Sequence, residues 1–111
     1  MCEAVKILDI KPELIINLQG DNPVCPPWFI EELIKAFEED PTVDLVTPCT
    51  ELSWEALDKL RESKKSTPFS GTTCVADKDG YALWFSKNII PAVRKEDALR
   101  EKGGKSPVLR H

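Results

Sequence analysis

Residues 13–18, in which a nearly continuous apolar run follows Glu13, constrain the fold of this chain more than any other feature. The run reads Leu-Ile-Ile-Asn-Leu and lacks the strict alternation of apolar and polar residues that marks a strand with one face in water. Such a run is typical of a central strand covered on both faces, as in parallel α/β sheets. We therefore expect residues 13–18 to form a buried strand that ends at Gln19-Gly20-Asp21.

The segments on either side of this run fit the same kind of sheet. Residues 2–10 predict the end of a helix. Pro26-Pro27 is suited to open a second helix, which has one apolar face and which Asp40-Pro41 ends. Residues 43–47 predict a second buried strand. The order helix, strand, helix, strand predicts an α/β unit with right-handed crossovers.

The second half of the chain has a different pattern. Ser53 is positioned to cap a short helix over residues 54–63. Residues 88–111 contain prolines, Gly-Gly and many charges, and they predict a long loop with a helical turn near residues 96–100. The final residues, Val-Leu-Arg-His, have the composition of a strand that is just beginning.

Between these parts lies the signal of a β-hairpin. Residues 72–76 and 81–85 are rich in β-forming side chains, and Asp77-Lys78-Asp79-Gly80 joins them. Gly80 is expected to adopt positive φ in this turn. A hairpin of this size is not stable alone, so we expect it to lie on a sheet or on a partner.

The composition narrows the class of protein. With 111 residues the chain predicts a single domain, in which residues 1–65 form the α/β part and residues 66–111 the hairpin and loop part. The net charge is −4 and the basic residues are dispersed among acids, so we expect no nucleic-acid partner. No apolar run approaches the roughly 20 residues that span a bilayer, and the start lacks a secretory signal. The expected location is therefore the cytoplasm, without a membrane partner.

The segment Gln19-Gly20-Asp21 has two interpretations. Gly-Asp-Asn-Pro is a common turn composition, and spacing alone favours a simple turn at the end of the strand. In an open α/β sheet, however, ligands bind beyond the carboxyl ends of the strands. There Asp21 offers an oxygen ligand suited to Mg²⁺, and the amide of Gln19 is able to bind a sugar hydroxyl or carboxylate.

Three motifs in order carry a family resemblance: INLQGDNP at residues 16–23, DKDGYALWFSKNIIP at residues 77–91, and LRH at residues 109–111. They resemble VNVQGDEP, DxxGYALYFSRxxIP and LRHxGIYxY of the bacterial CMP-Kdo synthetases, the 3-deoxy-manno-octulosonate cytidylyltransferases. Members of that family transfer CMP from CTP to a sugar acid with Mg²⁺ and release pyrophosphate, in the synthesis of lipopolysaccharide or surface sugars. The resemblance implies a partial Rossmann-like nucleotidyltransferase layer followed by a β-hairpin dimerisation element.

The resemblance also implies roles for individual residues. Asp21 matches a Mg²⁺ ligand, and Gln19 matches a sugar-acid contact. Lys87 stands where the family has Arg in YFSR, and it keeps the charge without the planar fork of a guanidinium. Arg94 matches a basic position after the family's Ile-Pro, and His111 matches the His of LRHxGIY near the sugar. Each of the last three is by composition alone most often a surface residue.

The hairpin implies a partner of its own. In the family this region contributes to the dimer contact, and Tyr81, Trp84 and Phe85 are large apolar residues on one short hairpin. A second copy of the chain would cover them, so a homodimer is expected.

Several departures from the family pattern leave two hypotheses open. The family's Pro-Ala-Arg…Gly-Lys loop, which holds the triphosphate, has no counterpart within residues 1–111, and Asn22 replaces an acidic residue beside Asp21. Under the first hypothesis the chain is a portion of a working cytidylyltransferase and does not turn over CTP by itself. Under the second it is a non-catalytic homodimeric binding or assembly module derived from that family.

Overall fold

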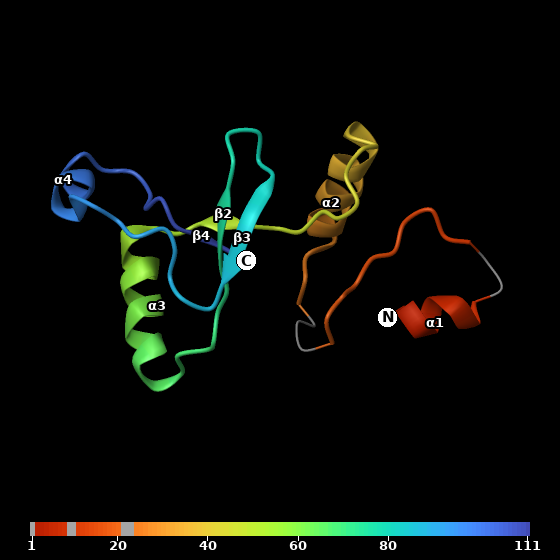
Figure 1. Cartoon of the computed structure of the whole chain (residues 1–111), viewed down its shortest axis with the longest axis horizontal. Coiled ribbons are helices and arrows are strands. Elements are labelled where there is room, and N and C mark those ends of the chain that lie inside the picture. The colour runs from red at the N-terminus through yellow and green to blue at the C-terminus, as the bar shows by residue number, and fades with distance from the viewer. Residues whose placement is uncertain (1, 9–10, 21–23) are drawn as a thin grey trace. The chain divides into compact units, whose positions relative to one another are not determined.

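A computed structural model of the chain describes residues 2–8, 11–20 and 24–111. Its helices and strands are shown in Figure 1: α1 (Cys2–Ile7), α2 (Pro27–Glu39), β1 (Thr50–Glu51), α3 (Trp54–Ser66), β2 (Thr73–Ala76), β3 (Ala82–Ser86), α4 (Glu96–Glu101) and β4 (Leu109–Arg110). The chain divides into two compact units, Met1–Pro41 and Thr42–His111. The first unit holds α1 and α2, and the second holds the sheet with α3 and α4.

Helix α2 confirms the prediction made from the proline pair. Pro26 has an extended backbone at the N-cap, and Pro27 occupies the first helical turn, where its missing N–H costs no hydrogen bond. The helix ends at Glu39, before Asp40-Pro41. Its apolar stripe is only half-buried within the described structure, and no residue of α2 is buried.

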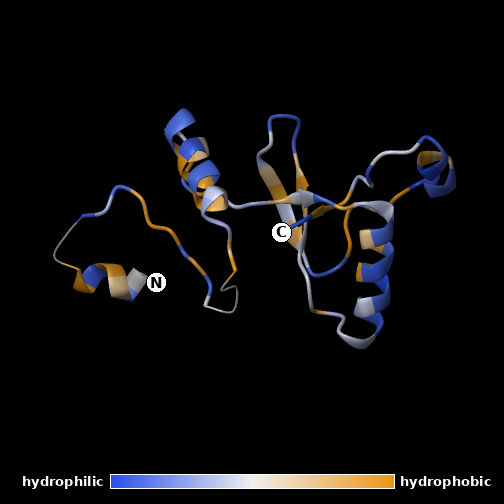
Figure 2. Cartoon of the chain, turned by 180° about the vertical axis from the view of Figure 1, so that it is seen from behind, coloured by the Kyte–Doolittle hydropathy of each residue, from blue (hydrophilic) through white to orange (hydrophobic). Residues whose placement is uncertain are grey.

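The two predicted buried strands are wrong. Residues 13–18 form no strand, and Ile15, Ile16 and Leu18 are 47%, 43% and 56% exposed. Figure 2 shows this stretch as a hydrophobic segment of irregular backbone before α2. Residues 43–47 are also irregular, and the strand β1 begins only at Thr50. The physical reason is that a strand needs neighbouring strands to pair its backbone, and the described residues supply none for either segment.

The sheet that does form is antiparallel throughout and has the strand order β1-β4-β2-β3. An α/β composition is therefore present, whereas a Rossmann-like parallel layer stays a prediction. The predicted hairpin is confirmed as β2 and β3, with Gly80 at φ 90° in the turn. The strand predicted at the last residues is confirmed as β4, which lies between β1 and β2.

Helix α3 supplies half of the buried core residues. The Ser53 side chain accepts a hydrogen bond from the Ala56 N–H at 3.1 Å, which confirms the predicted N-cap. The helix then places Leu57 and Leu60 against residues from the ends of β1 and β4. The buried apolar residues of this core are Leu52, Leu57, Leu60 and Val108. Ser106 connects the same two strand ends, since its hydroxyl and its N–H both donate to the Leu52 carbonyl at 2.8 Å.

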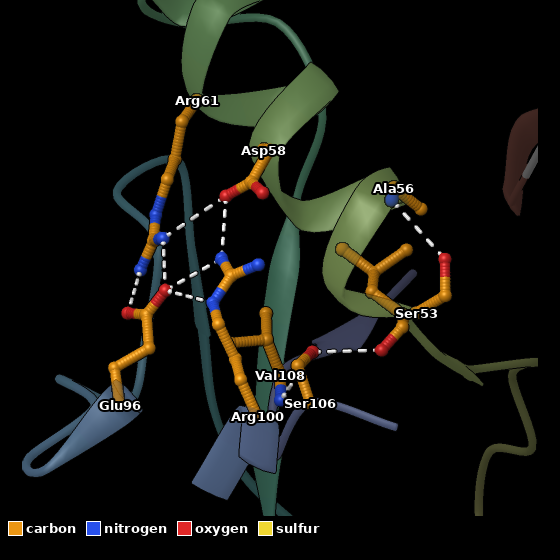
Figure 3. Close-up of polar contacts among 9 residues, drawn as sticks. Ser53, Ala56, Asp58, Arg61, Glu96, Arg100, Ser106 and Val108 are labelled. Carbon is orange, nitrogen blue, oxygen red and sulfur yellow. Dashed lines mark hydrogen bonds and ion pairs between the residues drawn. The ribbon is translucent and has the colours of Figure 1, made fainter. Parts of the chain in front are cut away.

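Ion pairs fasten α4 to α3, as Figure 3 shows. The Arg61 guanidinium donates two parallel hydrogen bonds to the Glu96 carboxylate, both 2.8 Å long. Arg100 donates to Glu96 and also to Asp58 at 2.7 Å, and its guanidinium lies 4.7 Å from the centre of the Trp54 ring. The helical turn predicted at residues 96–100 is thus confirmed as α4, and these contacts hold it to α3.

No helix in the described part of the chain is long and apolar enough to cross a membrane.

Candidate functional site

A β-bulge decides which side chains meet at the open end of the hairpin. Val75 pairs with Trp84 and Ala76 with Ala82, so the register shifts by one residue between these pairs. Beyond the bulge Thr73 pairs with Ser86, and the next position along brings Thr72 opposite Lys87. The Lys87 ammonium donates to the Thr72 hydroxyl at 2.8 Å. The bulge therefore places a predicted site residue beside a threonine.

His111 joins this pair from β4. Its backbone N–H donates to the Thr72 carbonyl at 3.0 Å. Its ring Nε2 lies 2.7 Å from the Thr47 hydroxyl, and the tautomer of the imidazole decides which of the two donates. The ring also contacts Phe85 edge to face, with centroids 5.4 Å apart. Thr72 is thus the common partner of Lys87 and His111.

These side chains share one face of the sheet. Residues that alternate along a strand point to opposite faces, so Thr72, Phe85, Lys87 and His111 lie on one side, and Thr73 and Arg110 on the other. A groove of about 300 Å³ lies between α3 and Arg110 on that other side. The candidate site therefore occupies the face that α3 leaves uncovered.

The chain after β3 is held close to the sheet by Thr73. This residue is fully buried, and its hydroxyl donates to the Asn88 carbonyl at 2.8 Å and accepts from the Ile90 N–H at 3.1 Å. Arg94 lies further along the same connection, is exposed, and has no hydrogen-bond or ion-pair partner among the described residues. Its guanidinium is therefore available to a ligand, but the contacts do not join it to Lys87.

The Gln-Gly-Asp segment is described only in part. Gln19 is exposed and lies in irregular backbone of the first unit. Asp21, the predicted metal ligand, lies outside the described residues. Within the described residues, no group of three His, Cys, Asp or Glu side chains is arranged to hold a metal ion.

Two cysteines lie near this face. Cys74 is buried on β2. Burial raises the pKa of the Cys49 thiol, and the neighbouring Cys74 thiol raises it further. Because only the thiolate is a good nucleophile, Cys49 is not prepared for nucleophilic chemistry at neutral pH.

Sequence reasoning missed Thr72 and Thr47, which hold Lys87 and His111. Thr72 directly precedes β2, so pairing the two strands of the hairpin residue by residue would place it opposite Lys87. That pairing is correct only if the bulge is taken into account. Thr47 lies 64 residues before His111, and no local pattern indicates that contact.

Comparison with known sequences gives the family. The profile of a family described as cytidylyltransferase matches residues 1–111. A protein of Maricaulis maris named 3-deoxy-manno-octulosonate cytidylyltransferase is 40% identical over 86% of this chain, which corresponds to 37% of the relative. Proteins of the same name from Chlamydia trachomatis and Zea mays are 40% and 32% identical, over 71% and 99% of this chain and 28% and 33% of their own lengths.

The chain thus spans about a third of the length of the curated relatives that it matches. No solved structure matches it significantly. The three ordered motifs, the profile match over all 111 residues and these relatives agree, and the chain belongs to the cytidylyltransferase family.

Proposed function

We propose that this chain forms the sugar-acid side of a cytidylyltransferase that transfers CMP from CTP to Kdo or a similar sugar acid, for lipopolysaccharide or surface-sugar synthesis. The observation that carries the proposal is the meeting of Lys87 and His111 at Thr72. Two side chains that the family pattern selects independently, from segments more than 20 residues apart, lie on one face of one sheet.

The chemistry of this cluster suits a carboxylate ligand. An ammonium has three N–H donors, and Lys87 uses one of them on Thr72. The remaining donors are able to pair with the carboxylate of a sugar acid, while the His111 imidazole binds a hydroxyl of the same molecule. A lysine binds a carboxylate as a point charge and not as a two-pronged fork, so the grip on the ligand is less directional than an arginine would give.

Arg94, which is exposed on the chain after β3, is proposed to supply a second positive charge to the sugar acid. A sugar-acid contact at Gln19 stays a prediction from the family pattern, because Gln19 belongs to the other unit. Mg²⁺ at Asp21 stays a prediction from the family pattern, because Asp21 lies outside the described residues.

By itself the chain is expected to bind the sugar acid but not to turn over CTP. Phosphoryl transfer depends on the groups that position and neutralise the phosphates. The family's Pro-Ala-Arg…Gly-Lys loop supplies such groups and has no counterpart within these 111 residues.

Binding of Kdo to the purified chain tests this proposal. Saturation-transfer NMR should give a Kdo signal with the wild-type chain and lose most of it with Lys87→Met. Lys78→Met is the matched control, because Lys78 lies at the turn end of the same hairpin and pairs with Asp79. A wild-type chain that gives no Kdo signal, or equal signals from both variants, would contradict the proposal.

Catalysis is tested separately by pyrophosphate release with CTP, Mg²⁺ and Kdo. We expect no turnover above that of Asp21→Asn, which controls for the synthetase of a bacterial expression host. Turnover that Asp21→Asn abolishes would show that these 111 residues bind and activate CTP without a counterpart of that loop.

A second candidate function, a homodimeric assembly module, is supported by the surface of the hairpin. Leu83 and Trp84 are 64% and 67% exposed, and β3, to which they belong, is the edge strand of the sheet. An apolar edge strand readily pairs with another chain. We expect a dimeric mass in light scattering at micromolar concentration, and a monomeric mass for the double variant Leu83→Ser, Trp84→Ser. A monomeric wild-type chain would refute this second function.

A further inference from the structure

The ammonium of Lys64 is surrounded by backbone carbonyl oxygens. Lys64 lies near the end of α3, and its Nζ is within hydrogen-bonding distance of four carbonyls. They belong to Pro68 at 3.3 Å, Ser70 at 2.6 Å, Gly71 at 3.0 Å and Lys87 at 2.5 Å. We refer to these four oxygens as the carbonyl cage. Because the donor is charged, such hydrogen bonds are stronger than those between neutral groups.

The carbonyl cage lies next to the ends of both strands of the hairpin. Gly71 directly precedes Thr72, and the Lys87 carbonyl belongs to the residue whose ammonium binds the Thr72 hydroxyl. One cation on α3 thereby holds the backbone on both sides of the Lys87–Thr72 contact. Gly71 is suited to this approach, since it has φ 70° and a Cβ there would lie 3.1 Å from Leu60 Cδ1.

Strand pairing does not fix this region by itself. The pairing of β2 with β3 ends at Thr73 and Ser86, so Thr72 and Lys87 lie one residue beyond it. The β2–β3 ladder supplies no hydrogen bond there, and the Thr72 carbonyl is bonded instead to the His111 N–H, just after β4. Residues just past the end of a ladder are the first to open. Opening at this end of the hairpin would separate Thr72 from Lys87, and the Lys64 hydrogen bonds hold the backbone at that place.

We propose that Lys64 is a positioning residue, whose ammonium holds the backbone of Gly71 and Lys87 so that the Lys87 side chain stays aimed at Thr72 and the ligand. The inference rests on the proposed function for what Lys87 binds, and on the carbonyl cage for how Lys87 is held. Lys64 itself does not contact the sugar acid.

A chemical-rescue experiment tests the proposal. Lys64→Ala removes three methylene groups and the ammonium, and n-propylammonium contains the same chain of three carbons and an ammonium. The first readout is amide hydrogen exchange at His111, whose N–H binds the Thr72 carbonyl, with the Leu57 amide inside α3 as a check that the fold persists. The second readout is the Kdo signal in saturation-transfer NMR.

The control variant is Lys65→Ala, which makes the same charge change one residue later, at an exposed side chain that pairs with Glu62. In Lys64→Ala the His111 amide should exchange at least tenfold faster than in the wild-type chain, and the Kdo signal should be several-fold weaker. The exchange rate of the Leu57 amide should not change. Addition of n-propylammonium should restore both the His111 exchange rate and the Kdo signal, whereas n-propanol, which is uncharged, should not. The variant Lys64→Arg should show the same fast exchange at His111 and the same weak Kdo signal as Lys64→Ala, because a planar guanidinium does not fit the four carbonyl oxygens that surround the ammonium.

The negative outcomes are distinguishable. Unchanged exchange at His111 in Lys64→Ala, or rescue by n-propanol as well, would overturn the role of the ammonium. A Kdo signal that Lys64→Ala leaves at the wild-type level would overturn the positioning role while the proposed function stands. Absence of the Kdo signal from the wild-type chain would refute the proposed function, and with it the role of Lys64 in sugar-acid binding.

Discussion

The two units of this chain use apolar residues very differently. In Thr42–His111, Leu57 and Val108 are completely buried, and a four-stranded sheet and a capped helix surround them. In Met1–Pro41 the sequence is at least as apolar in its Leu14–Leu18 segment, but none of the described residues is buried. Each unit is thus rich in side chains that favour burial, and only the second encloses them.

The difference shows what apolar content needs in order to become a core. In the second unit, the core residues come from α3 and from the ends of two strands that are far apart in the sequence. In the first unit, neighbouring segments are a short helix and one amphipathic helix, which offer no second layer within the described structure. Burial therefore depends on the partners that the chain brings back from a distance.

The largest effect should appear when the two units are separated. Residues 42–111 expressed alone should unfold cooperatively on heating, because their core residues all come from that unit. Residues 1–41 alone should show little stable helix, since isolated helices shorter than about 12–15 residues are marginal in water. Circular dichroism of both pieces measures this. A cooperative transition in residues 1–41, or none in residues 42–111, would show that the stable core does not lie in the second unit alone.

A smaller effect is expected from single apolar deletions in the whole chain. Leu57→Ala should lower the free energy of unfolding by about 2–5 kcal/mol, because Leu57 is fully buried. Ile15→Ala, at a half-exposed side chain of the first unit, should change it by no more than about 0.5 kcal/mol. Urea titrations compare the two. Similar losses would mean that residues 13–18 contribute to a core after all.

Removal of the helix cap should cost less again. The two longer helices differ at their starts, since the Ser53 side chain caps α3 and Pro26 offers no side-chain cap to α2. Ser53→Ala should destabilise the second unit by about 1 kcal/mol, whereas Ser53→Asp, which keeps an acceptor oxygen, should have little effect. If both substitutions cost the same, the cap is not the source of the stability.

The smallest effect should come from the ion pairs between α3 and α4, and it should depend on pH. Hydrogen bonds from Arg61 and Arg100 lower the pKa of Glu96 from 4.5 to about 2. A lowered pKa in the folded state means that the stabilisation is fully present above pH 4.5 and is lost as the pH falls towards 2.

Glu96→Gln removes this contribution. Its thermal midpoint should lie below that of the wild-type chain at neutral pH, and the difference should shrink between pH 4.5 and pH 2. Glu101→Gln makes the same charge change at the other end of α4 and serves as the control. A difference that stays constant down to pH 2 would rule out the carboxylate as its source.

Much of the local structure could be predicted because it depends on neighbouring residues. Pro26-Pro27 determines where α2 begins, Ser53 where α3 begins, and Gly80 where the hairpin turns. The strand predicted at residues 13–18 failed for the opposite reason. Its composition suits a central strand, but strand formation requires backbone partners that composition does not reveal.

Two residues of the candidate cluster were predicted from the sequence, and their role in binding a sugar acid stays a prediction. Lys87 and His111 were selected by their place in family motifs, and the structure brings them together. The sequence did not predict the contacts of Thr72, Thr47 and Lys64. Thr72 meets Lys87 because of the bulge in β3, and Thr47 contacts His111 across 64 residues. Lys64 reaches the Lys87 carbonyl from helix α3.

The sequence alone therefore determined the family of this protein, the positions of its helices and turns, and the kinds of side chain that are available to bind a ligand. Motifs and caps are local patterns, so they can be recognised without coordinates. Only the tertiary structure decided which apolar segment is buried and which cation faces which threonine. A shift of one residue in strand register moves a side chain to a different partner, and no local pattern in this sequence indicates that shift.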